Sequence, residues 1–217
     1  MKKIFFLTLA IVFLTAAAVF AQEKIEAPAW NVEDKRAFDG GGPMEALNCD
    51  DHCYLVRFSG GVFPQSASGV AILGSSTLNI THVTDGNNRK KYLDTRKKIL
   101  NFPLTTGKQW KDLYQQTEPG MDGMVLVEYN ETFRVLGWEE EEVRAGKFKA
   151  GKVEYKIEPL EWSSLGCCPR PESKAYLWYP PEAKNLVKCH FEKGYYEGFG
   201  EAGARKNWEL VSYELKK

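Results

Sequence analysis

The stretch MVLVEYNETFRVLGW, residues 124–138, decides the fold class because its side chains alternate with a period of two. One face carries Val125, Val127, Tyr129, Phe133 and Val135, and the other carries Leu126, Glu128, Asn130, Thr132 and Arg134. Alternation over ten or more residues predicts a long strand with one face buried. The rest of the chain can be compared with this pattern.

The segments on either side repeat the strand pattern. GKVEYKIEPL, residues 151–160, places Val153, Tyr155 and Ile157 inward, and NWELVSYELKK, residues 207–217, is also strand-like. The stretch KAYLWYPPEAKNLVKCHF predicts a hairpin that turns at two prolines, because proline fixes φ and cannot donate to a ladder. Weaker candidates for strands are 53–58, 68–74, 76–83 and 97–104.

The segment KQWKDLYQQ, residues 108–116, also fits a short helix, because Trp110, Leu113 and Tyr114 are spaced at i, i+3 and i+4. Elsewhere strands follow one another through short turns, without the helical crossovers that parallel pairing requires. The sequence therefore predicts an all-β fold. We expect a mostly antiparallel sheet forming a sandwich or partly open barrel, with an irregular N-terminal arm.

The first residues have the layout of a secretory signal peptide. Two lysines precede an apolar run, and small residues end it near Ala21, before polar QEK. The alternative is a membrane anchor, since the uncharged run is near the lower length limit for a span. We expect a signal peptide at 1–21, an irregular arm at 22–50 and a β-rich domain at 51–217, with a possible subdivision near 98. The mature protein is expected to be soluble and periplasmic or secreted.

The charge balance excludes one class of partner. The chain has 29 basic and 29 acidic side chains, and removing residues 1–21 leaves 27 basic ones. A nearly neutral chain lacks the basic surface that binds nucleic acid. No second apolar segment approaches membrane-spanning length, so no transmembrane segment is expected after signal cleavage.

Four segments, in this order, resemble the signatures of the DUF3108-like or TapB-like family of uncharacterised bacterial exported β proteins. They contain a Phe-Pro-Leu and Gly-Lys-x-Trp stretch, a glycine turn, a Trp-Tyr-x-Pro hairpin and a Glu-Leu-Val-x-Tyr strand. Arg144 and Lys147 stand where the family often has proline and threonine. The resemblance implies an extracytoplasmic, strand-rich domain and carries over no catalytic or ligand residue. The matching segments are 101–110, 143–157, 175–188 and 208–215.

The cysteines are expected to form disulfides, because thiols of exported proteins usually oxidise. The first choice is a loop from Cys49 to Cys53, closed by a turn at Asp50 and Asp51. The alternative is a disulfide between this segment and LGCCPRP, which contains the adjacent cysteines Cys167 and Cys168. At most one of these two is expected to bond to Cys189 or to an N-terminal cysteine. Because the number of cysteines is odd, one of them is left without a partner within the chain. The five are Cys49, Cys53, Cys167, Cys168 and Cys189.

The stretch NCDDHC also raises a metal hypothesis, since Cys49, His52 and Cys53 are three borderline or soft ligands. A tetrahedral zinc site needs four ligands, usually with a second ligand pair further on. Only Cys189 and His190 could supply that pair. We therefore predict no metal and no cofactor, and keep a metal-handling protein as an alternative.

The tryptophans Trp110, Trp178 and Trp208 are core anchors or, alternatively, line an aromatic groove for a ligand. No serine-hydrolase elbow, zinc-protease helix or phosphate loop occurs, and no catalytic residue is predicted. The sequence favours a non-catalytic exported protein that binds an unknown small ligand or an envelope component. The alternative enzyme is an envelope-acting hydrolase with a dispersed site around His82, His190 and a carboxylate.

Overall fold

The computed structural model describes a β protein over most of its length. Residues 1–21, read as a signal peptide, and Cys167 and Cys168 lie outside the described residues. The structure describes residues 24–39, 43–58, 69–78, 80–85, 90–92, 98–120, 123–159, 172–193 and 207–217.

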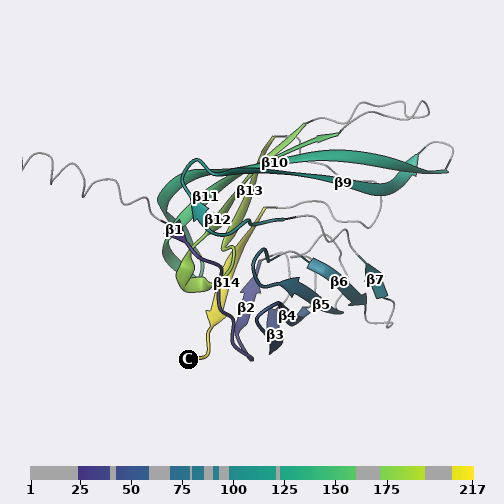
Figure 1. Ribbon diagram of the computed structural model, residues 1–217. Coiled ribbons are helices and arrows are strands. Elements are labelled where there is room, and N and C mark those ends of the chain that lie inside the picture. The colour runs from purple at the N-terminus through teal and green to yellow at the C-terminus, as the bar shows by residue number, and fades with distance from the viewer. Residues whose placement is uncertain are drawn as a thin grey trace, which may run out of the picture.

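Fourteen strands and one short 3₁₀ turn make up the described secondary structure (Figure 1). The turn η1 spans Pro181–Ala183 and joins two strands of a hairpin. The strands are β1 Lys24–Ile25, β2 Lys35–Phe38, β3 Pro43–Cys49, β4 Cys53–Phe58, β5 Gly69–Gly74, β6 Ile80–Asp85, β7 Lys90–Tyr92, β8 Leu104–Thr105, β9 Gln109–Gly120, β10 Gly123–Val143, β11 Gly146–Pro159, β12 Ser173–Tyr179, β13 Lys188–Lys193 and β14 Trp208–Glu214.

Twelve strands form one sheet in the order β7-β6-β5-β4-β3-β2-β14-β13-β12-β11-β10-β9, and β1 pairs with β8 in a small second sheet. All paired strands are antiparallel. The edge strands β7 and β9 do not pair with each other, so the sheet is open. The predicted all-β, antiparallel fold is confirmed.

Strand β10 shows why the alternating stretch decides the fold. Tyr129, Phe133 and Val135 are buried, while Arg134 between them is exposed. The ring of Phe133 stacks between those of Trp110 in β9 and Tyr155 in β11, with centroids 5.1 and 4.6 Å away. This cross-strand stack explains why residues 108–116 form strand β9 and not a helix, because only a strand aligns Trp110 with Phe133.

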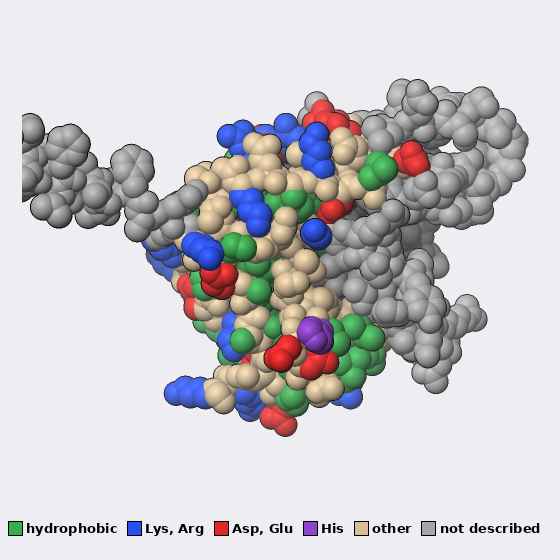
Figure 2. All heavy atoms as spheres, in the orientation of Figure 1, with side chains coloured by type: hydrophobic (Ala, Val, Ile, Leu, Met, Phe, Trp, Pro, Cys, Tyr) green, Lys and Arg blue, Asp and Glu red, His purple; other side chains and the backbone are tan. Residues whose placement is uncertain are grey.

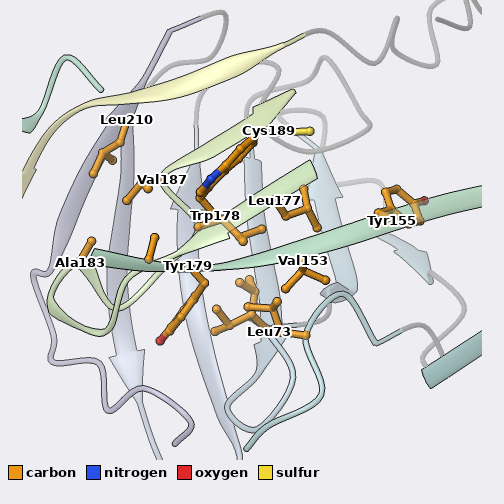
Figure 3. Packing of buried hydrophobic residues seen from close by; sticks show 14 of the residues in the cluster. Leu73, Val153, Tyr155, Leu177, Trp178, Tyr179, Ala183, Val187, Cys189 and Leu210 are labelled. Atoms are coloured by element: carbon orange, nitrogen blue, oxygen red, sulfur yellow. The ribbon is translucent and has the colours of Figure 1, made fainter. Parts of the chain in front are cut away.

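The two halves of the sheet enclose one core. Figure 1 shows β9–β13 on one side and β2–β7 on the other, with β14 between them. Leu73 of β5, Val153 of β11 and Tyr179 of β12 all belong to this core (Figure 3). Strand β14 joins the halves, because its first residues pair with β13 and its later residues pair with β2.

The N-terminal segment expected as an arm is irregular over residues 26–34. On either side it contributes β1, β2 and β3 to the sheets. The proposed division of the chain at residue 50, with a further boundary near 98, stays a prediction. Within the described ranges, the structure contains no helix with the length and apolar character needed to cross a membrane.

Replacing Leu210 by alanine tests the role of β14. Leu210 is fully buried and its N–H donates to the Val187 carbonyl, so the two halves meet at this residue. Deleting a buried leucine side chain costs about 2–5 kcal/mol. We expect Leu210→Ala to lower the free energy of unfolding by that amount in urea denaturation. The exposed neighbour Ser212 gives the control Ser212→Ala, expected to change it by about 0.5 kcal/mol or less. Equal effects of the two substitutions would contradict this role.

Candidate functional site

A buried ion pair lies where the irregular segment enters β2. The side chains of Asp34 and Arg36 are both fully buried, and Arg36 Nη2 lies 3.7 Å from Asp34 Oδ2. The backbone N–H of Lys216 donates to Asp34 Oδ1, and that of Asn31 donates to Asp34 Oδ2. The carboxylate therefore ties the arm to the segment that follows β14.

Arg36 is less completely satisfied than its partner. Its Nε donates to the Ala183 carbonyl at 3.1 Å, and its guanidinium lies 4.2 Å from the ring centroid of Trp30. Nη1 and Nη2 are buried and make no hydrogen bond. Burial lowers the pKa of Arg36 to about 10, although the negative charge of Asp34 acts in the opposite direction. We call Trp30, Asp34 and Arg36 the arm hub.

The hub fastens the turn between β12 and β13 to the arm. The Trp30 ring stacks on Tyr54 at 4.8 Å, and its Nε1 donates to the Lys184 carbonyl at 2.6 Å. The hydroxyl of Tyr54 donates to the Pro28 carbonyl. Lys184 adopts the left-handed conformation, with φ 53°, and its Nζ lies 3.8 Å from Asp34 Oδ2. Arm and turn are thus held in place by the same few residues.

Between them lies an open pocket of about 350 Å³. Residues 24–29 form one wall, and Tyr179, Pro181 and Lys184 form the other. A second hollow of about 230 Å³ shares Lys24, Ile25 and Pro181 with the first. It reaches Trp138, whose Nε1 is buried without a hydrogen-bond partner. We call the two hollows together the arm pocket.

The polar groups around the arm pocket favour a ligand that accepts hydrogen bonds. The indole nitrogen of Trp138, beside the smaller hollow, is a donor only, whereas the fully buried Arg36 lines neither hollow. Burial raises the pKa of Tyr179, so its phenol stays protonated at neutral pH. Lys24 and Lys184 add positive charge at the pocket wall. The arrangement fits oxygen atoms of a bound molecule.

The predicted loop from Cys49 to Cys53 is wrong, because both are free thiols in the structure. Cys49 pairs with Tyr54 across the β3–β4 hairpin, and Cys53 is the residue before Tyr54. Successive side chains of a strand point to opposite faces, so the two thiols point away from each other. Cys49 packs against the core, whereas the Cys53 thiol donates to Asp50 Oδ2. The alternative pairings with Cys167 or Cys168 lie outside the described residues.

The metal alternative has no matching arrangement in the part of the chain that the structure describes. There, no three side chains of His, Cys, Asp or Glu are grouped as metal ligands would be. His52 and His190 are exposed, and the backbone of His82 lies in β6 opposite Ile72. Asp50 instead stabilises the hairpin turn, since its Oδ1 accepts the N–H groups of His52 and Cys53.

The three tryptophans proposed as groove residues lie in three different places. Trp110 is buried in the inner stack, and its Nε1 donates to the Lys98 carbonyl. Trp178 is also buried, with the ammonium groups of Lys152 and Lys188 over its ring and its Nε1 donating to Glu139. Trp208 is half-buried, edge-on to Phe38. None of the three lines the arm pocket.

Sequence reasoning missed the hub because residues 26–34 have no period. One signal was available: Arg36 and Phe38 have the spacing of one strand face, so a charged residue shares the buried face. Glu131 was missed in the same way. It falls on the inward face of β10 between Tyr129 and Phe133, is fully buried, and accepts a hydrogen bond from the hydroxyl of Tyr155.

The hub predicts unequal effects of removing its two charges. Asp34→Asn leaves Arg36 buried without a counter-charge, and breaking a buried pair in this way costs about 3–5 kcal/mol. Arg36→Met leaves Asp34 with Lys184 nearby, so we expect a smaller loss of unfolding free energy. We expect the double variant to lose less than the sum of the two. Urea denaturation of the three variants measures these differences, and strict additivity would exclude coupling between the two charges.

The Cys53 thiol predicts a second measurable effect. Burial raises its pKa, and the hydrogen bond and negative charge of Asp50 raise it further. Since only the thiolate is alkylated, Asp50→Asn should lower that pKa and speed alkylation of Cys53 at pH 7–8 severalfold. Iodoacetamide labelling of the reduced protein, followed by mass spectrometry, gives the rate. The neighbouring substitution Asp51→Asn is the control and should leave the rate close to that of the original protein. An unchanged rate in Asp50→Asn would exclude this influence.

No family model matches the chain, and no curated protein matches it significantly. Among solved structures, the hypothetical lipoprotein YmcC from Escherichia coli K12 is similar, with a TM-score of 0.42 and 9% identity over 94% of this chain and 96% of that one. A protein from Bacteroides fragilis, described as exported and as having a YmcC-like fold, gives a TM-score of 0.36 and 10% identity over 88% of this chain and 99% of the other. These values carry no argument about function, and the resemblance to the DUF3108-like or TapB-like family stays a prediction.

Proposed function

We propose that this chain is an exported, non-catalytic β protein that binds a small ligand or an envelope component in the arm pocket. Export is supported by the signal-peptide layout of residues 1–21. Binding rests on one observation. The arm pocket is lined by Lys184 and, in its smaller hollow, by Trp138, whose buried Nε1 has no hydrogen-bond partner in the protein.

The size and position of the arm pocket support a binding role. Ligand pockets typically have volumes of about 300–1,000 Å³ and combine apolar walls with a few polar groups. The larger hollow, at about 350 Å³, is at the lower end of that range. Its walls come from segments far apart in the chain, which the hub holds together. A preformed wall of this kind loses little entropy when a ligand binds.

The charges near the pocket support binding more than catalysis. Asp34 is fully buried and lines neither hollow, so its carboxylate does not reach a ligand in the pocket. The phenol of Tyr179 is a weak acid whose pKa burial raises further. Figure 2 shows acidic and basic side chains interspersed over the face in view, in keeping with the small net charge of the chain.

Filling the pocket tests the proposal. Ala27 lies in the pocket wall and is exposed, so Ala27→Trp should occupy the hollow without disturbing the core. Val32, which is 48% exposed on the same arm and outside the pocket wall, gives the control Val32→Trp. Each protein is purified from its exported fraction and its mass recorded under native conditions.

We expect cleavage near Ala21 and a stoichiometric extra mass on the original protein and on Val32→Trp, but not on Ala27→Trp. Retention of that mass by Ala27→Trp would place the ligand elsewhere. The absence of any extra mass, together with no gain in thermal stability from an envelope lipid extract, would contradict binding.

A further inference from the structure

We infer that the ligand of the arm pocket carries an anionic oxygen group, a carboxylate or a phosphate monoester, on a short apolar body. This inference rests on the proposed function and names the chemical class of its ligand. Three independent features of the pocket point to it: the unsatisfied donors, the local balance of charge and the apolar wall.

The unsatisfied donors come first. Arg36 is fully buried, and its Nη1 and Nη2 make no hydrogen bond. Trp138 Nε1, beside the smaller hollow, is buried without a hydrogen-bond partner as well. Leaving a buried donor unsatisfied costs about 1–3 kcal/mol, and more for a charged group. A ligand with an acceptor oxygen in the smaller hollow offers Trp138 the partner that the protein does not, whereas Arg36 lines neither hollow.

The local charge gives the sign of the ligand. Asp34 is the one carboxylate within ion-pair distance of both Arg36 and Lys184 among the described residues. Lys24 is neutralised by Glu26 at 2.6 Å. Among the charged side chains that line the two hollows, Lys24, Lys149 and Lys184 are basic and Glu26 and Glu182 are acidic, so the lining carries a net positive charge. An anion balances it, whereas a cationic ligand would add to the repulsion.

Lys184 is the residue placed to meet that anion. Its side chain is 25% exposed and lines the larger hollow, and the turn holds its backbone through Trp30. Arg36 lies directly behind, since its Nε is bonded to the carbonyl of the preceding residue, Ala183. Lys184 therefore contacts the anionic group, while Arg36 is a positioning residue that adds its field and steadies the turn.

The opposite part of the wall is apolar. Ile25, Ala27, Pro28, Ala29 and Pro181 provide carbon surface around the opening. Burying such surface contributes about 25 cal/mol per Å². A ligand with a short hydrocarbon portion gains this contribution, and a free inorganic anion does not.

Four probes with the same eight-carbon chain separate these contributions: octanoate, octyl phosphate, octanol and octylamine. Binding to the full mature protein is measured by isothermal titration calorimetry at low and high salt. We expect octanoate and octyl phosphate to bind at least tenfold more tightly than octanol, with a difference that shrinks in high salt. Octylamine should bind more weakly than octanol.

Two lysine variants locate the charge. Lys184→Gln removes the positive charge at the pocket and should weaken octanoate binding at least tenfold. Lys35→Gln removes an equal charge beside Arg36, from a position of β2 that faces solvent, and should change it less than twofold. Circular dichroism confirms that both variants remain folded.

The outcomes separate this inference from the proposal on which it rests. If octanol binds as tightly as octanoate and Ala27→Trp abolishes both, the anionic class is overturned and the binding function stands. The anionic class is likewise overturned, and the binding function stands, if native mass spectrometry shows a ligand in the pocket but neither octanoate nor octyl phosphate binds. If no probe binds and no ligand copurifies, both are overturned. Equal weakening by Lys184→Gln and Lys35→Gln would overturn the role of Lys184.

Discussion

The buried contact between Asp34 and Arg36 is the interaction on which the rest of the structure depends. Through hydrogen bonds of these two side chains, residue 34 reaches Lys216 and residue 36 reaches Ala183. One charged pair thus links the arm, the β12–β13 turn and the segment after β14. Burying two charges is unfavourable unless each is well paired. Here both oxygens of the Asp34 carboxylate accept hydrogen bonds, whereas Nη1 and Nη2 of the Arg36 guanidinium donate none.

The arm pocket follows from the same contact. Trp30 stacks between Arg36 and Tyr54 and bonds the Lys184 carbonyl, so arm and turn stand at a set separation with a hollow between them. Because aromatic rings and backbone carbonyls hold the walls, the pocket is largely formed before anything binds. The guanidinium of Arg36 stabilises the turn through Nε, while its Nη1 and Nη2 make no hydrogen bond.

The sequence predicted what depends on local pattern and missed what depends on distant contacts. Alternation in residues 124–138 was enough to predict β10, because period two is a property of a single strand. The hub has no such signal, since Arg36 and Ala183 are 147 positions apart and Lys216 and Asp34 are 182 apart. The prediction of a disulfide between Cys49 and Cys53 was wrong for a related reason. Proximity along the chain favoured a bridge, but only the pairing of Cys49 with Tyr54 shows that the thiols point to opposite faces.

The place of β14 in the sheet has a consequence for biogenesis. Glu209 bonds to Asp39 across 170 positions of sequence, so β2 gains this neighbour only after nearly the whole chain has been synthesised. Until then β2 and β13 each present an open edge, and open edges invite pairing with other chains. Long-range closure of this kind also slows folding. Any route that delivers this polypeptide progressively, from ribosome or translocon, must keep the first half from associating before its last strand arrives.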